Sequence, residues 1–374
     1  MERRILTYLQ AHQAEILQDL YLLVQAQAST SDIPQLQICR QTLEQIITDR
    51  TGIIPAVYKT EGGHDMLRFE YGRSAEQVLL VGHYDTVHPV GSFGFREEGN
   101  RLIGPGIYDM KSGLVSAIWT IRAYQQLGIT PGKKIVVLFN GDEETGSEES
   151  TATICREAGQ SAAALVLEPA TTEGDLKTGR KGMLRFRITI SGREAHSGNA
   201  HADGVSALEE LAHEILFLHS LTDYNAGVTT NVGIAQGGTK VNVVAGQAVL
   251  EAEARFCTAL QKEQIINTVC RRKAHLPGIV RTVEVLDNRD PMEQTEKNLQ
   301  LFEKAHSCAQ KLGISFGHQF VGGFSDANPI SAMGIPVLDG LGAVGGCAHA
   351  PEEYIIKKEY IPRIALLAAL ITTL

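Results

Sequence analysis

The sequence predicts an α/β fold in which a mostly parallel sheet forms the main domain and a smaller αβ domain is inserted into it. Between Val78 and Glu168, apolar runs typical of buried parallel strands alternate with a helical pattern. From Met183 onward, apolar and polar residues alternate strictly, as in an antiparallel strand that is wet on one face. Helix and strand patterns resume after Asp290, so we expect the main domain to be discontinuous.

The length of 374 residues exceeds what one hydrophobic core usually serves, so we expect two domains. The main domain is predicted to comprise residues 1–181 and 289–374, and the inserted domain residues 182–288. The formal net charge of −9 argues against nucleic acid and anionic membranes as partners.

The N-terminal segment carries charged residues among its apolar positions, which leaves neither a signal-peptide core nor a membrane span of about 20 apolar residues. We therefore expect an amphipathic helix there and a cytoplasmic protein. The six cysteines are far apart and include no C-x-x-C pair, so the sequence favours neither a disulfide framework nor a thiolate zinc site. Buried free thiols are expected instead.

The main domain is expected to begin with helices and to continue with strands. Leu114, Ala117 and Ile118 recur at helical spacing, which predicts a helix over Gly113–Leu127 between two strands of the sheet. The other elements predicted in this part are helices over residues 1–50 with a break at Thr30–Pro34, and strands at Val57–Lys59, Met66–Tyr71, Val78–Val81, Ile135–Phe139 and Ala164–Leu167.

The inserted domain is predicted to be a small two-layer αβ lid, because antiparallel strand patterns alternate there with two helical patterns. Its elements after the strand at Met183 are predicted at Gly204–Leu221 (helix), Thr229–Gln236 and Ala248–Phe256 (strands), Gln261–Lys273 (helix) and Ile279–Leu286 (strand). The main domain then resumes with a helix at Leu299–Leu312, a glycine-rich turn at Gly322–Asn328, a strand at Ile335–Leu338 and a C-terminal helix.

Three of the predicted strands run directly into imidazole or carboxylate side chains. His83 follows the first, Glu143 and Glu144 follow the second, and Glu168 follows the third. In open α/β sheets the carboxyl ends of the strands are where ligands bind, so this pattern predicts a metal site. Imidazole and carboxylate without thiolate suit catalytic zinc, cobalt or manganese. The full set of candidate residues is His83, Asp85, Asp109, Glu143, Glu144, Glu168 and His349.

Five ordered motifs, GHYDTVHPVG, GPGIYDMKSG, GDEETGS, LEP and GGFSDAN, give the chain a family resemblance. It resembles the zinc metallopeptidases of the aminoacylase/glutamate carboxypeptidase family, most closely their glutamate carboxypeptidase branch, over nearly its whole length. The resemblance implies a mostly parallel-sheet di-metal catalytic domain with an inserted αβ sandwich domain for lid closure and dimerisation. The sequence departs from the family pattern at two places. Ala350 follows His349 where relatives often have serine, and Phe324 with Ser325 replaces smaller or different residues in the glycine-rich turn. The second departure weakens any claim of glutamate specificity.

The resemblance also implies a role for each metal-site residue. Glu143 would be the general base, and the peptide bond after Asp109 would be cis. Asp85 is close enough in sequence to accept the ring N–H of His83 that a metal leaves free, which would fix the tautomer. Two Zn²⁺ ions per chain are implied, with Co²⁺ or Mn²⁺ as substitutes. Their implied ligands are His83 and Glu168 for one ion, Glu144 and His349 for the other, and Asp109 as the bridge.

The substrate residues are likewise implied by the resemblance. His196 would reach the partner subunit's active site and stabilise the oxyanion, which implies a homodimer formed through the lid. Arg255 and Asn242 would bind the substrate's free carboxylate and nearby polar groups. The backbone of Gly322 and Gly323 could approach the same carboxylate, since glycine carries no side chain. One residue of a basic cluster could also assist an acidic substrate; the cluster comprises Lys177, Arg180 and Lys181.

The predicted function is therefore that of a zinc-dependent exopeptidase, which cleaves an amide next to a free α-carboxylate with Glu143 activating the water. An N-acyl amino acid deacylase of the same fold is the alternative, because the metals and Glu143 would serve either reaction equally. A non-catalytic binding protein is less favoured, since it would need to have lost a ligand or the base. The six residues concerned are all present, namely His83, Asp109, Glu143, Glu144, Glu168 and His349.

Overall fold

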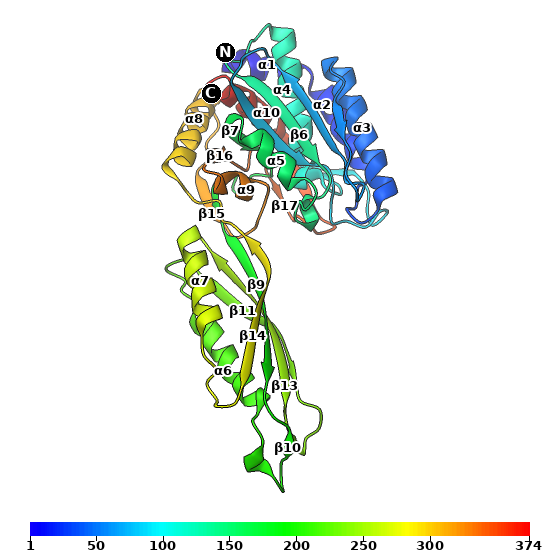
Figure 1. Cartoon of the computed structure of the whole chain (residues 1–374). Coiled ribbons are helices and arrows are strands. Elements are labelled where there is room, and N and C mark those ends of the chain that lie inside the picture. The colour runs from blue at the N-terminus through cyan, green and yellow to red at the C-terminus, as the bar shows by residue number, and fades with distance from the viewer. The chain divides into compact units, whose positions relative to one another are not determined.

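Figure 1 shows the computed structural model of the protein, which describes all residues from 1 to 374. Contacts divide the chain into two compact units. The main unit comprises Met1–Thr178, Gln294–Val321 and Ser325–Leu374, and the inserted unit comprises Gly179–Glu293 and Gly322–Phe324. The predicted α/β fold, with a mostly parallel central sheet and a separate antiparallel sheet, is confirmed.

The central sheet of the main unit has six strands in the order β1-β2-β6-β3-β7-β16. Strand β3 is buried along its whole length and runs parallel to both of its neighbours, β6 and β7. The carboxyl ends of these three strands therefore lie side by side. The bounds are β1 (Ala56–Tyr58), β2 (Met66–Tyr71), β3 (Gln77–His83), β6 (Lys134–Asn140), β7 (Ser161–Val166) and β16 (Val337–Leu338).

Helices pack against this sheet and form the largest core. Helix α4 (Ser112–Leu127) is buried on nearly all sides because it contacts α1, α3, α10 and the sheet. Val78 and Leu80 of β3 face this core, as alternation along a strand requires. The other helices of the main unit are α1 (Glu2–Ala11), α2 (Gln13–Gln25), α3 (Ile33–Thr51), α5 (Thr151–Ala158), α8 (Glu296–Leu312), α9 (Ala327–Ala332) and α10 (Lys357–Ile371).

Several short strands of the main unit were not predicted. A four-stranded ladder in the order β17-β18-β5-β4 joins segments that are far apart in sequence. The strands of this ladder have two or three residues and are too short for a periodic pattern to reveal. They are β4 (Arg96–Glu98), β5 (Arg101–Ile103), β17 (Gly345–Gly346) and β18 (Tyr354–Ile356). Two longer strands that were also missed, β8 (Leu176–Arg180) and β15 (His318–Val321), pair with each other.

The inserted unit is a two-layer αβ sandwich. Its sheet, in the order β11-β13-β9-β14, is antiparallel throughout. The predicted alternation in β9 is confirmed, since Leu184 and Phe186 are buried whereas Arg185 is exposed. Two helices cover the apolar face. The bounds are β9 (Gly182–Ser191), β10 (Ala195–His196), α6 (Ala207–Ser220), β11 (Thr229–Gly237), β12 (Val243–Val244), β13 (Gln247–Phe256), α7 (Ala259–Arg271) and β14 (Val280–Arg289).

Two further expectations concern the helices and the cysteines. No helix combines the length and the apolar character that a membrane-spanning segment requires. All six cysteines are free thiols, but burial was correctly predicted only for Cys39 and Cys308. Cys270 and Cys347 are exposed, because Cys270 lies near the end of α7 on its outer side and Cys347 lies in the loop after β17.

Candidate metal centre

The carboxyl ends of β3, β6 and β7 bring three predicted residues together. His83 is the last residue of β3 and is 1% exposed. Its Nε2 atom lies 3.5 Å from Glu168 Oε1 and 4.0 Å from Glu143 Oε2. One donor atom from each of these side chains falls within 4.8 Å of the others, which is close enough for one metal ion to bind them together.

Asp109 connects this group to a second one. Its Oδ1 lies 3.2 Å from His83 Nε2, and its Oδ2 lies 3.4 Å from His349 Nε2. On that second side, His349 Nε2 also lies 3.2 Å from Glu144 Oε2. The two oxygens of one carboxylate thus face two different imidazoles, each of which has its own additional carboxylate. The Asp109–Met110 peptide bond is cis, as the resemblance implied.

Charge at the centre is unbalanced in favour of the carboxylates. Burial raises the pKa of Glu143 well above its usual value, and the neighbouring charges of Glu168 and Asp326 raise it further. Hydrogen bonds to Asp109 and Glu144 raise the pKa of His349 to about 10. Burial alone would raise the pKa of Asp109, but hydrogen bonds from both imidazoles hold it well below its usual range. All three pKa shifts have a cause in common, which is that several buried carboxylates lie close together and a positive charge among them is stabilising.

The donor set fits divalent cations. Glu144 Oε1 is buried and has no hydrogen-bond partner, so one carboxylate oxygen of the cluster has its lone pairs available. A buried oxygen without a partner is costly unless a ligand satisfies it. No thiolate is present among the donors, and imidazole with carboxylate suits zinc and its neighbours.

The turn after β6 explains how two adjacent glutamates both reach the centre. Residues Glu143–Thr145 form a short 3₁₀ helix, η2. The fully buried carboxylate of Asp85 accepts the N–H of Glu143 at 3.3 Å with Oδ1 and the N–H of Glu144 at 3.2 Å with Oδ2. The hydroxyl of Thr30 also donates to Asp85 Oδ2, at 2.8 Å. Asp85 therefore holds both glutamates in place through their backbone.

Asp85 also lies where the sequence suggested it would fix the ring of His83. His83 Nδ1 is 3.1 Å from the backbone oxygen of Asp85 and 3.3 Å from Asp85 Oδ1. A proton held on Nδ1 by these acceptors would leave the lone pair of Nε2 available to a metal ion.

A further buried carboxylate near the centre was missed. Asp326 accepts hydrogen bonds from Ser147 Oγ at 2.5 Å and Asn140 Nδ2 at 3.0 Å. These bonds tie the segment that follows Glu144 to the start of α9. The motif GGFSDAN contains Asp326, but nothing in the sequence distinguishes it from the aspartates that commonly occupy turns.

At one end of the inserted unit lie Arg255 and the glycine segment. Arg255 is near the end of β13 and forms an ion pair with Glu253. Arg180 is buried, and its Nη1 donates to the carbonyl oxygens of Gly323 and Phe324, both at 3.1 Å. Arg180 therefore holds the segment Gly322–Phe324 through carbonyl oxygens, and it does not engage the N–H groups of this segment.

His196 and Asn242 lie at the opposite end of the inserted unit. His196 pairs with Val243 in the short β10–β12 ladder, and its Nδ1 accepts the N–H groups of Gly198 and Asn199. This ladder lies beyond the Gln247 end of β13, whereas Arg255 is eight residues along that strand, roughly 25 Å away at the usual rise per residue. Within the unit, the predicted substrate residues do not gather at one place.

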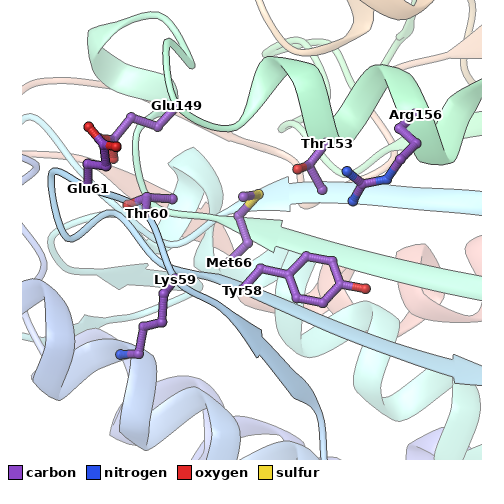
Figure 2. A pocket seen from close by; sticks show the side chains of 8 residues that line it. All are labelled: Tyr58, Lys59, Thr60, Glu61, Met66, Glu149, Thr153 and Arg156. Atoms are coloured by element: carbon purple, nitrogen blue, oxygen red, sulfur yellow. The ribbon is translucent and has the colours of Figure 1, made fainter.

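A separate cavity of about 560 Å³ opens on the main unit, between β1, β2 and α5. Figure 2 shows the ring of Tyr58 and Arg156 toward one end of it, the carboxylates of Glu61 and Glu149 at the other, and Met66 between them. None of the residues predicted for the metal centre or for substrate binding lines it. It is therefore distinct from the predicted active site.

The chain matches known proteins over most of its length. Residues 79–373 match peptidase family M20/M25/M40. Carboxypeptidase G2 from Pseudomonas sp. (strain RS-16) is 29% identical over 368 residues, covering 96% of this chain and 88% of that protein. Succinyl-diaminopimelate desuccinylase from Variovorax paradoxus is 25% identical over 303 residues, covering 74% of this chain and 76% of that one.

Solved structures show the same fold. The aminopeptidase PepT from Bacillus cereus has a TM-score of 0.79 at 23% identity, and the match covers 96% of this chain and 98% of that one. The resemblance inferred from the five motifs is confirmed by the match to the family. The chain belongs to peptidase family M20/M25/M40, and it is a metal-dependent hydrolase.

Proposed function

We propose that the protein is a di-metal exopeptidase that hydrolyses an amide bond next to a free α-carboxylate. The observation that supports this most directly is the placement of Asp109, whose two carboxylate oxygens face two separate imidazoles. Such an arrangement suits a pair of ions that share one ligand and act on one water. The similarity to carboxypeptidase G2 at 29% identity favours a substrate with a free carboxylate.

Two zinc ions are proposed as the native cofactors. A pair of such ions would lower the pKa of a shared water toward 7 and polarise the scissile carbonyl. Five residues are proposed as ligands, and the distances are compatible with the following division. The proposed ligands are His83 and Glu168 for one ion, Glu144 and His349 for the other, and Asp109 for both.

Glu143 is the proposed general base. Its Oε2 is 4.0 Å from His83 Nε2, slightly farther than the oxygens of Asp109 and Glu168. Burial and the surrounding carboxylates raise its pKa, which makes it a better proton acceptor than an exposed glutamate. Glu143 would take the proton of the attacking water on a carboxylate oxygen and deliver it to the nitrogen of the leaving amine.

Arg255 and the backbone of Gly322 and Gly323 are proposed to bind the substrate's α-carboxylate. A guanidinium matches a carboxylate with two parallel hydrogen bonds. Lys177 is a further candidate, since its Nζ lies 4.0 Å from Glu168 Oε2. A substrate anion near the centre would gain from this cation.

A homodimer formed through the inserted unit is also proposed, with His196 and Asn242 of one subunit acting at the other's site. The separation of these residues from Arg255 supports this arrangement. Strand β11 is an edge strand, and it is exposed over most of its length. Exposed apolar side chains on β11 and α6 add to this surface, namely Ile234 at 49%, Leu216 at 70% and Leu208 at 42%. An open edge with apolar neighbours is the usual setting for strand pairing between subunits.

The alternative reaction is removal of an acyl group from an N-acyl amino acid. The 25% identity to a succinyl-diaminopimelate desuccinylase favours it, and the metal centre would serve it equally. A panel of dipeptides, glutamate conjugates and N-succinyl and N-acetyl amino acids, assayed with zinc, cobalt and manganese, separates the two. Exopeptidase function requires faster turnover of the peptides and conjugates. Faster turnover of the N-acyl amino acids would replace it with deacylation.

Metal analysis of the purified protein tests the centre itself. About two metal ions per chain are expected, with loss of activity on chelation and recovery on adding zinc. A protein that binds no metal and turns over none of these substrates would be a binding protein that has kept the fold.

A further inference from the structure

A single buried carboxylate, that of Glu353, gathers four hydrogen-bond donors beside the metal centre. Glu353 is 0% exposed. Its Oε1 accepts the N–H of Tyr108 at 2.8 Å and the N–H of Asp109 at 3.0 Å. Its Oε2 accepts the N–H of Gly106 at 3.2 Å and lies 2.6 Å from Nε2 of His88. Both oxygens are thus used twice, which nearly fills the capacity of the group.

These bonds join three segments that each carry a proposed metal ligand. His88 lies five residues after His83, and the bonded N–H groups lead directly into Asp109. Glu353 itself lies four residues after His349. The sequence separations across the side-chain bonds are 244 to 265 residues, so only the folded chain brings these groups together.

The position of Glu353 is itself fixed by the backbone around it. Its carbonyl oxygen accepts the N–H of Gly104 at 3.1 Å. The next residue, Tyr354, begins β18, which pairs with Ile103 of β5. The pairing of β18 with β5 therefore fixes the position of the Glu353 carboxylate.

Removing the carboxylate of Glu353 would leave several buried N–H groups without a hydrogen-bond acceptor. These N–H groups lie at the start of a distorted helical turn over Ile107–Lys111, where N–H groups have no partner within the helix, and Gly106 adopts a left-handed backbone with φ of 71°. Successive N–H groups that point into one concavity are a natural anion site. Without an anion there, the backbone must shift to find other acceptors, and the side chain of Asp109 would move with it.

We propose that Glu353 is a positioning residue that holds Asp109 between the two groups of metal ligands and so sets the affinity for metal. The inference rests on the proposed role of Asp109 as the shared ligand. Glu353 touches neither metal nor substrate. It acts through the backbone of Asp109, in the way that outer hydrogen bonds orient the ligands of other metal sites.

Glu353→Gln is the most informative substitution because it keeps the size of the side chain. The amide has one oxygen and one NH₂ group, so in either orientation the NH₂ meets donors where an oxygen accepted them. Glu210→Gln is the matched control. Glu210 is equally buried in the inserted unit and accepts the N–H groups of His275 and Leu276, both at 2.8 Å, with no metal ligand among its partners.

The experiment is a titration of the metal-free proteins with zinc against a competing chelator, combined with thermal unfolding of the metal-free forms. Wild type and Glu210→Gln should bind zinc equally. Glu353→Gln should bind it about 10–100-fold more weakly, while its metal-free form loses no more thermal stability than the Glu210→Gln form does. A loss of kcat that added zinc restores in part is expected in parallel.

Two other results are decisive in different ways. Equal zinc affinity in wild type and Glu353→Gln, or an equal loss in both glutamine variants, would overturn the role of Glu353. Absence of zinc binding in the wild type would instead refute the metal centre on which the proposed function depends.

Discussion

Arg255 and Glu253 form a two-point ion pair along β13, with Arg255 Nε 2.7 Å from Glu253 Oε1 and Nη2 3.1 Å from Glu253 Oε2. Alternate residues of a strand share a face, which places the two side chains next to each other. The pair occupies one edge of the guanidinium. A substrate carboxylate that binds Arg255 must therefore use the remaining edge or displace Glu253.

The first prediction follows from this competition. Glu253→Gln should lower KM by up to about fivefold for substrates with a free carboxylate, the effect expected from releasing a solvent-accessible ion pair of about 0.2–1 kcal/mol. Arg255→Lys should reduce kcat/KM about 10–100-fold, because one point charge does not replace a fork. Steady-state kinetics on free-acid and amidated forms of one substrate measures both effects.

The amidated substrate is the control for this prediction. It should be poor for the wild type, and neither substitution should change its turnover much. Equal turnover of the two forms by the wild type would exclude Arg255 as the carboxylate anchor and favour a broader amidase.

The second prediction separates the roles of Glu143 and Glu144. Both side chains reach the centre from η2, and distances alone admit either as a ligand. Glu143→Gln should reduce kcat about 10²–10⁴-fold while metal content stays normal, since a general base is lost and a coordination bond is not. Glu144→Gln should lose metal. Metal analysis beside single-turnover kinetics distinguishes them.

The opposite pattern, with metal lost from Glu143→Gln and retained in Glu144→Gln, would exchange the two assignments. Asp85 bonds to both backbones, so Asp85→Asn should impair both functions and is not a control for either.

The strands that were predicted from the sequence differ in kind from those that were not. The long apolar run of β3 and the alternation in β9 carry strong patterns, because each strand has a constant environment along its length. The ladder of β4, β5, β17 and β18 could not be foreseen, since its two- and three-residue strands are stabilised by distant neighbours. That ladder nonetheless places Glu353.

The residues of the candidate site also divide into those that the sequence could place and those that it could not. His83 and Glu168 follow buried strands, so sheet geometry alone indicates that they converge. The turn that directs Glu143 and Glu144 together depends on Asp85, 58 and 59 residues away, and adjacency in sequence would have suggested opposite directions. Roles that depend on long-range hydrogen bonds leave no local pattern to read.

The third prediction concerns Asp326 in the metal-free protein. Burial raises the pKa of this carboxyl from 3.8 to about 7. A carboxyl with a higher pKa in the folded state contributes stability that is present below about pH 4 and is lost as pH rises toward 7. Asp326→Asn removes this titration. Its Tm should therefore fall less than that of the wild type between pH 4 and pH 7, by about 2 °C or more.

The substitution should be tolerated because its partner can adapt. Asn140 Oδ1 is buried without a hydrogen-bond partner, so turning over the amide of Asn140 would offer that oxygen to the new NH₂ group. Thermal unfolding in chelator at several pH values gives the comparison. Parallel pH profiles for the two proteins would show that Asp326 is ionised throughout.

The last prediction tests the proposed dimer. His196 lies at the far end of the inserted unit from Arg255, so we expect it to serve the site of the other subunit. His196→Ala and Glu143→Gln should each be nearly inactive alone. When the two variants are mixed and allowed to exchange subunits, a hybrid dimer has one site with neither substitution and one site with both. Mixtures should therefore recover up to about a quarter of wild-type activity, since half of the dimers are hybrids at equilibrium.

Subunit exchange must be shown independently, for example by mass measurement of hybrids made from tagged and untagged chains. A mixture of Glu143→Gln with Glu144→Gln is the matched control, because both residues belong to the same site of one chain. In that hybrid each site keeps one substitution, so no activity should return. No recovery with His196→Ala despite proven exchange would place His196 in the site of its own subunit or outside the active site altogether. Recovery in the control would show that Glu143 and Glu144 do not belong to the same site of one chain.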